Sequence, residues 1–250
     1  MNPTIINIKM PTSWSELADD QLYYVYNLLA DNLSAAQVKT YCMFLWGKLK
    51  VVCRYGDGYL IRKGKTEAYV TAAVLCNALH ALDFIEALPA EPVRIGVVKD
   101  HAAVEATLQG VAFERYLYVE NLYQGYLHSQ QHTLLTEMGE LLYDSEGLTL
   151  NRAEKMNVFY WWTALKAYFA KQFPHFLQPS RDDSDLLGGG SAQSLSRRLQ
   201  DSMNAQIRAL TKGDITKERD ILNMDTWRAL TELDALAREY EEINRKYGKS

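Results

Sequence analysis

The sequence has little that would place it outside the cytoplasm. Its three cysteines (Cys42, Cys53 and Cys76) are odd in number, so we expect reduced thiols and no disulfide framework. Polar residues interrupt every apolar run well short of the roughly 20 residues that a membrane-spanning helix needs. The start, MNPTIINIKMPTSW, lacks the basic region and apolar stretch of a secretory signal. We predict a cytoplasmic protein that binds no membrane.

A basic surplus and the common catalytic motifs are also lacking. The formal net charge is −4, which argues against broad electrostatic binding to nucleic acid. The sequence contains no GxSxG elbow, no CxxC pair and no GxGxxG loop. We therefore predict a chain that is not an enzyme and holds no cofactor. Since distant residues can still assemble a site, an enzyme or small-molecule binder stays open as an alternative.

Gly64-Lys65-Thr66 matches the end of a phosphate-binding loop, but its surroundings indicate a hairpin turn. Five residues separate Gly58 from Gly64, whereas a phosphate-binding loop has four at that point. Those residues, YLIRK, alternate as in a strand, and the following EAYV also favours a strand. The stretch therefore predicts two strands joined by a tight turn, without a nucleotide site.

The whole pattern predicts a predominantly helical α+β protein. Residues 1–179 are expected to form one mainly helical globular domain with a small antiparallel β-meander. Strands are predicted near 4–10, 51–54, 59–63 and 67–70. Helix-start signals occur at Ser13 with Glu16, Ser34 with Gln37, Thr71, and Asn151 with Glu154. The helix after Asn151 is apolar on nearly every face, which predicts a central position in the core.

The composition changes after residue 179. Residues 180–193 are polar and glycine-rich, as is typical of a flexible linker. Two amphipathic segments follow, at 194–211 and from near Thr216 to about Tyr247. We predict that 194–250 forms a C-terminal amphipathic helical hairpin.

The second segment carries a heptad stripe. Apolar positions recur at alternating spacings of four and three: Leu222, Thr226, Ala229, Leu233, Leu236, Tyr240, Ile243 and Tyr247. The shorter helix can cover only about half of this stripe. The uncovered part can dock on the main domain, self-associate or bind a partner protein, and the sequence leaves the three open. The candidate partner-binding residues are Leu222, Trp227, Leu230, Leu233, Leu236, Tyr240, Ile243 and Tyr247.

His128 and His132 form the one pair with the spacing of metal ligands. Four residues apart, they would share a helix face. No Asp, Glu or Cys at helical spacing completes a ligand set. We predict no metal site.

Several segments resemble the phage tail assembly chaperones of Bacteroides-type prophages. They are MPTSWSELADDQLYYVYNLL, FERYLYVENLYQGYL, VFYWWTALKAYFAKQFPHFLQP, MNAQIRALTKGD and MDTWRALTELDA. The resemblance implies a non-enzymatic assembly protein in the host bacterial cytoplasm. Such a helper coats the helical tape-measure protein before the tail tube forms and is absent from the finished particle. A structural particle component, such as a connector or tail-completion protein, is the second interpretation.

Overall fold

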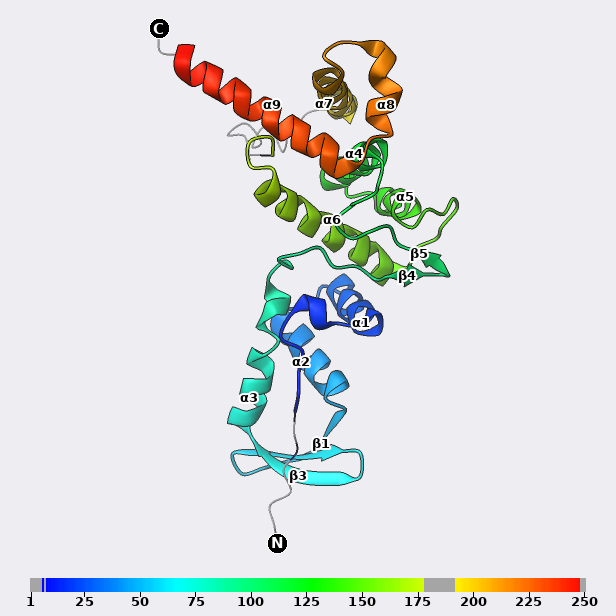
Figure 1. The fold of residues 1–250 in the computed structure, drawn as a ribbon. Coiled ribbons are helices and arrows are strands. Elements are labelled where there is room, and N and C mark those ends of the chain that lie inside the picture. The colour runs from blue at the N-terminus through cyan, green and yellow to red at the C-terminus, as the bar shows by residue number, and fades with distance from the viewer. Residues whose placement is uncertain (1–5, 7, 178–191, 248–250) are drawn as a thin grey trace.

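The protein has two lobes joined through helix α1 (Figure 1). The computed structural model describes residue 6 and residues 8–177 and 192–247. A small three-stranded sheet with helices α2 and α3 lies at one end, and helices α4 to α9 form the other. The predicted class, α+β with a predominance of helix and an antiparallel meander, is confirmed. The predicted linker lies almost entirely outside the described residues.

The sheet lobe is built on the predicted meander. Its strands are β1 (Leu49–Tyr55), β2 (Gly58–Lys63) and β3 (Thr66–Thr71), paired antiparallel in the order β1-β2-β3. Gly64 has φ +61° in the turn between β2 and β3, so the Gly-Lys-Thr stretch is a hairpin turn. Helices α2 (Ala35–Trp46) and α3 (Ala72–His80) pack against the edge strands, and the short helix η2 (Asp83–Glu86) follows.

The predicted strand at 4–10 is wrong for the residues that the structure describes. Residues 6 and 8–10 have no regular structure, and 4, 5 and 7 lie outside the described part. Ile6, Ile8 and Met10 are half-buried against the core. The alternation of apolar residues therefore arises because one side of an irregular segment is buried, and it does not require a strand partner.

The first long helix begins later than the sequence pattern predicted. Residues Trp14–Glu16 form only a short helix, η1, and α1 runs over Asp19–Ala30. The Glu16 carboxylate accepts the Thr12 N–H at 2.8 Å, so it does not close a capping box with Ser13. The capping boxes at Ser34 with Gln37 and at Asn151 with Glu154 are confirmed.

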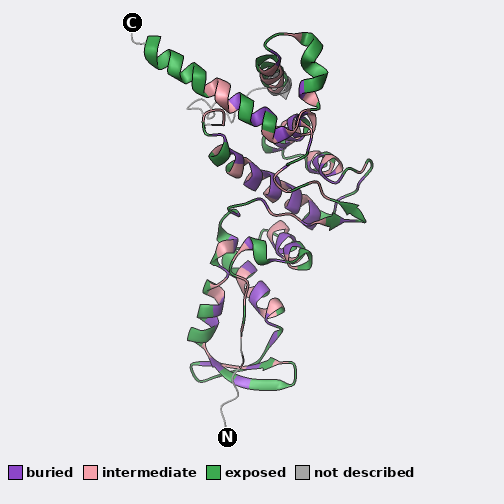
Figure 2. Cartoon of the chain, in the orientation of Figure 1, coloured by how far each residue is buried: buried purple, intermediate pink, exposed green. Residues whose placement is uncertain are grey.

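The helical lobe is assembled around α6 (Arg152–Gln172). Helix α5 (His132–Leu142) packs on it, and α4 (Phe113–Ser129) contacts it through aromatic rings. The small pair β4 (Val97–Val98) and β5 (His101–Ala102) belongs to the same lobe. Figure 2 shows buried residues along most of α6. Seven of its residues have no exposed surface: Asn157, Val158, Trp161, Trp162, Ala164, Leu165 and Phe169. The prediction of a central core helix is confirmed.

A polar network is buried beside α6. The Asn157 Oδ1 accepts the Ile95 N–H at 2.9 Å, and Asn157 Nδ2 donates to the Tyr143 hydroxyl at 2.9 Å. That hydroxyl donates to the Ile95 carbonyl at 2.8 Å. Because each buried polar group finds a partner, the network fixes the loop before β4 without the cost of an unpaired donor.

Helix α1 connects the lobes by packing on α6 and on α2. At one end the Asp19 carboxylate accepts the Gly96 N–H at 2.9 Å, and at the other Asp31 pairs with Arg152 at 2.9 Å. In the described part of the chain, none of the helices is long and apolar enough to cross a membrane.

Candidate partner-binding surface on helix α9

The C-terminal part of the chain forms three helices that lie against α4, and the last of them also packs on α6. These are α7 (Ala192–Thr211), α8 (Glu218–Leu222), preceded by the short helix η4 (Ile215–Lys217), and α9 (Thr226–Tyr247). Helices α7 and α9 pack on each other, as in the predicted hairpin, and both also contact α4. Half-buried Met203, Ile207 and Leu210 of α7 pack against the main core.

The long helix predicted from Thr216 onward is two helices, so the stripe is interrupted. Leu222 is the last residue of α8, and residues 223–225 separate it from α9. The Asn223 side chain donates to the Arg219 carbonyl at 2.9 Å, and the Asp225 carboxylate accepts the Arg228 N–H at 3.2 Å. One side chain thus ends α8 and the other caps α9. Leu222 therefore does not share the face of α9.

The start of α9 is joined to the segment before α4. The Thr226 N–H and hydroxyl both donate to the Val111 carbonyl, at 2.9 and 2.7 Å. The Gly110 N–H donates to the Asp225 carboxylate at 2.6 Å, and the Phe113 N–H donates to the Met224 carbonyl at 2.8 Å. These bonds fix the position from which α9 leaves the lobe.

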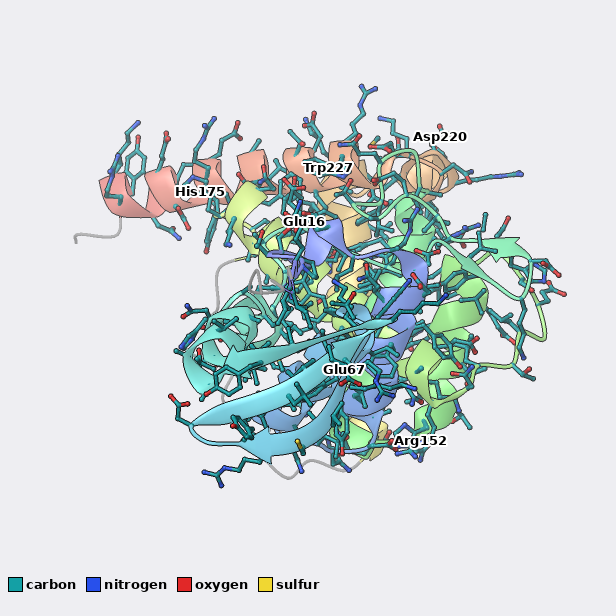
Figure 3. All side chains as sticks on the ribbon, turned by 90° about the horizontal axis from the view of Figure 1, so that it is seen from below. Glu16, Glu67, Arg152, His175, Asp220 and Trp227 are labelled. Carbon is teal, nitrogen blue, oxygen red and sulfur yellow. The ribbon has the colours of Figure 1, made fainter. Side chains whose placement is uncertain are left out.

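Trp227, labelled in Figure 3, anchors α9 on the end of α6 through its ring contacts. Its indole N–H donates to the Thr107 carbonyl at 2.6 Å. Its ring lies 6.1, 5.7 and 5.4 Å from the rings of Tyr168, Phe169 and Phe173. Edge-to-face ring pairs of this kind contribute beyond the area they bury. Trp227 is thus a core anchor within the chain.

Leu230 and Leu233, two further candidate partner-binding residues, are also buried by the chain itself. Leu230 has no exposed surface and Leu233 is 3% exposed. Immediately after Leu233, the Asp234 carboxylate accepts the N–H groups of His175 and Phe176 at 2.7 and 3.0 Å. Of the three ways to cover the stripe, docking on the main domain therefore accounts for this half of α9.

The same stripe is exposed in the last turns of α9. Leu236 is half-buried, whereas Tyr240 is 67%, Ile243 54% and Tyr247 76% exposed. Figure 1 shows this part of the helix extending past the body of the protein. We call these four residues the distal face. Their spacing of four, three and four places them on one side of the helix.

The side of α9 opposite the distal face is charged. Arg238, Glu242 and Arg245 lie on the opposite side of α9, and all three are exposed. Glu241 pairs with His175 at 3.0 Å, the last described contact between α9 and the chain after α6. Beyond it α9 is an amphipathic helix whose apolar side is exposed in the described part of the chain.

The two histidines considered as a metal pair do not share a helix. His128 belongs to α4, and His132 is the first residue of α5. Between them Gln130 has φ 56°, a left-handed turn that separates the helices. The prediction that they share a helix face is wrong. Among the described residues, no group of three or more His, Cys, Asp and Glu side chains could hold a metal ion.

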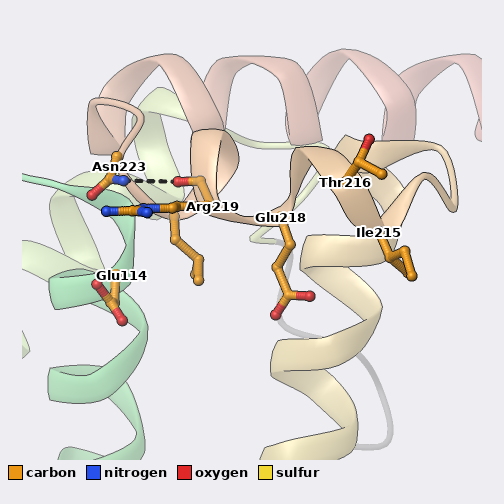
Figure 4. A pocket seen from close by; sticks show the side chains of 7 residues that line it. Glu114, Ile215, Thr216, Glu218, Arg219 and Asn223 are labelled. Atoms are coloured by element: carbon orange, nitrogen blue, oxygen red, sulfur yellow. Dashed lines mark hydrogen bonds between the residues drawn. The ribbon is translucent and has the colours of Figure 1, made fainter.

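A shallow depression of about 560 Å³ lies between α4 and α8 (Figure 4). Glu114 contributes from α4, and Glu218 and Arg219 contribute from α8. Ile215, at its rim, is 82% exposed. Apart from Glu114 and Leu222, the lining residues are exposed. The depression therefore lacks the buried charged groups that are typical of a catalytic site.

The distal face is thus the part of the sequence-derived candidate set that stays accessible. Comparison of the chain with protein-family models, with curated proteins and with solved structures found no match.

Proposed function

We propose that this protein is a non-enzymatic assembly protein that binds a helical segment of another protein through the distal face of α9. The observation that carries the proposal is the exposure of Tyr240, Ile243 and Tyr247 on a stripe whose first half is buried. Such a stripe is the recognition element of helix-in-groove and helix-pair complexes. The two tyrosines supply large contact area with a polar tip, which suits a surface that is alternately wet and covered.

The anchoring of α9 supports the same proposal. Trp227, Asp234 and the bonds around Thr226 hold the helix before a partner arrives. Binding of a partner therefore does not include the conformational entropy cost of forming α9. From Leu236 to Tyr247 the distal face spans roughly 16 Å of helix, enough for about three turns of a client.

The size of the distal face indicates reversible binding. Covering three large side chains that are already partly buried contributes about 3–6 kcal/mol. Rigid-body association costs about 4 kcal/mol or more. The contact is therefore weak when one copy acts alone and gains from repetition along a long client. A helper that must later be released needs binding of this kind.

The client that we propose is a phage tape-measure protein. The resemblance to phage tail assembly chaperones of Bacteroides-type prophages names this class, and a long helical protein offers many successive binding sites. In this proposal the protein works in the host cytoplasm, keeps the helices of the tape-measure protein soluble, and leaves as the tail tube forms.

The test is co-expression of the full chain with the tape-measure protein of the same prophage. The triple variant Tyr240→Ala, Ile243→Ala, Tyr247→Ala should lose most of the soluble client recovered with the wild type. Arg238→Ala, Glu242→Ala, Arg245→Ala is the matched control, because it changes three exposed residues on the other side of α9. It should behave as the wild type.

Two results would contradict the proposal. One is equal recovery of soluble client with both triple variants. The other is a stable dimer of the wild type, detected by sedimentation, that is lost only in the apolar triple variant. The distal face would then be an interface between two copies. Recovery of the protein in purified particles would favour the structural-component alternative.

A further inference from the structure

A second uncovered surface lies at the opposite end of the molecule, along strand β1. Within the described part of the chain, β1 is hydrogen-bonded to β2 only, so its other edge has no strand partner. Leu49 is buried, and the six residues after it are exposed. An edge strand of this kind presents a row of backbone N–H and C=O groups that can pair with another chain.

The side chains of β1 favour strand pairing. Val51 is 47% and Val52 43% exposed, and Cys53 is also exposed. Because β-branched residues fit a pleated, half-covered surface, a strand laid along this edge would find apolar contacts as well as backbone partners.

The sheet also carries a charge opposite to that of the whole chain. Residues 48–71 hold six cationic and two acidic side chains, a net charge of +4 in a protein whose net charge is −4. One of the cations, Arg62, is paired with Glu67 across β2 and β3. Within the described residues, Lys50 and Arg54 on β1 have no carboxylate partner, so part of the unneutralised charge lies on the edge strand.

We propose that the outer edge of β1 binds an extended, acidic peptide segment of a partner protein, which adds to the sheet as a fourth strand. Backbone pairing would hold the segment, and Lys50 and Arg54 would select its charge. This inference goes beyond the proposed function, because it concerns another surface and another conformation of the bound chain.

The register of the sheet predicts the spacing of the acidic residues. Lys50 lies opposite Arg62 and Arg54 opposite Tyr59, three positions apart on β2, because the pairing shifts between Val51 and Cys53. An odd spacing on a regular strand places two side chains on opposite faces. Acidic residues three positions apart in the incoming strand would therefore meet one cation on each face of the sheet.

Charge favours an acidic peptide on this edge over a second copy of the chain and over nucleic acid. In an edge-to-edge dimer, Lys50 and Arg54 of one copy would lie near the same cations of the second copy, and like charges placed opposite each other destabilise strand pairing. For nucleic acid, Tyr69 is a poor stacking platform, because its ring packs edge-on to Tyr55 at 6.2 Å and its hydroxyl bonds to the Asp57 carboxylate. That carboxylate would repel phosphate.

The test is binding of the full chain to a labelled peptide, acetylated and amidated, with the sequence Thr-Val-Glu-Val-Thr-Glu-Val-Thr. Fluorescence anisotropy should show saturable binding. The double variant Lys50→Glu, Arg54→Glu should weaken it at least ten-fold. Arg197→Glu, Arg198→Glu on α7 makes the same change in net charge at exposed positions of the other lobe and should bind as the wild type does.

Peptides with N-methyl groups at alternate backbone nitrogens separate strand pairing from simple charge attraction. Methylation of one set of alternate residues should abolish binding, and methylation of the other set should leave it unchanged. Equal binding of both peptides would overturn the proposal. So would tighter binding of a twenty-nucleotide oligo(dT), or a wild-type dimer that is lost in the Lys50→Glu, Arg54→Glu variant. The apolar triple variant of α9 should bind the peptide normally, so failure here is distinguishable from failure of the proposed function.

Discussion

The Asp234 carboxylate of α9 accepts the backbone N–H of His175, 2.7 Å away, just past the end of α6. It accepts the N–H of Phe176 as well. This junction lies where α9 passes from the buried half of its stripe to the exposed half. The strength of the junction therefore decides how firmly the distal face is held.

We expect Asp234→Ala to lower the free energy of unfolding by about 1–3 kcal/mol, because two backbone donors lose an ionised acceptor. Urea unfolding followed by circular dichroism measures the change. Asp234→Asn keeps an acceptor oxygen and should cost less. Glu239→Ala, at an exposed position on the same helix, should change the unfolding free energy by less than about 0.5 kcal/mol. Equal losses in Asp234→Ala and Glu239→Ala would contradict this account of the junction.

Two helical glycines should respond differently to alanine. A Cβ at position 139 would lie 2.5 Å from Cδ1 of buried Leu150, whereas a Cβ at position 125 would lie 3.3 Å from Cδ1 of half-buried Leu134. Alanine improves helix propensity by about 1 kcal/mol, and overpacking costs about 1–3 kcal/mol. Gly139→Ala should therefore destabilise the protein, and Gly125→Ala should be neutral or stabilising. Thermal unfolding compares the two, and a more stable Gly139→Ala protein would show that the α5 contact is loose.

The three thiols should differ in reactivity. Burial raises the pKa of the Cys42 thiol to about 12, and Cys42 has no exposed surface. Cys53 and Cys76 are exposed. Since the thiolate is the reactive form, iodoacetamide at pH 8 should label two cysteines in the native protein and all three in denaturant. Mass spectrometry of the peptides identifies them, and native labelling of Cys42 would refute the prediction.

Stability should fall in alkali because of buried tyrosines. Burial raises the pKa of the Tyr26, Tyr116 and Tyr143 hydroxyls above the ordinary 10.0. Below that pH both folded and unfolded chains keep these protons. Above it, the unfolded chain loses protons that the folded chain retains, so the free energy of unfolding decreases by about 1.4 kcal/mol per pH unit for each tyrosine.

Urea titrations between pH 8 and pH 11 test this alkaline loss. The Tyr26→Phe variant should show a shallower decline above pH 10, because one of the three contributing groups is gone. Tyr247→Phe, at an exposed position, is the control and should leave the slope unchanged. A flat profile in the wild type would contradict the prediction.

The sequence predicted best those features in which a side chain and its partner are close along the chain. The caps at Ser34 and Asn151 and the turn at Gly64 belong to this group. The break between α8 and α9 was missed, although Asp225 has the residue type and position of a helix cap. Gly110, which bonds to Asp225, and Val111, which bonds to Thr226, come from a distant segment of the chain, and the spacing of apolar residues carries no information about them.

The candidate surface was only partly predictable for a related reason. Leu233 and Tyr240 lie on one face of one helix, so spacing alone treats them alike. What separates them is that α6 ends at Gln172, and among the described residues the last contact between α9 and the chain after α6 is the pair of Glu241 with His175. Which turns of α9 find cover is therefore a property of tertiary structure.

The position of Trp227 bears on how the protein is made. It completes the aromatic site formed by Tyr168, Phe169 and Phe173, yet it is synthesised 54 residues after Phe173. A nascent chain on the ribosome must therefore carry the end of α6 with its rings bare, while the sheet lobe, earlier in the chain, can already be folding. Pauses in translation before this codon lengthen the time during which the unfinished lobe is prone to aggregate.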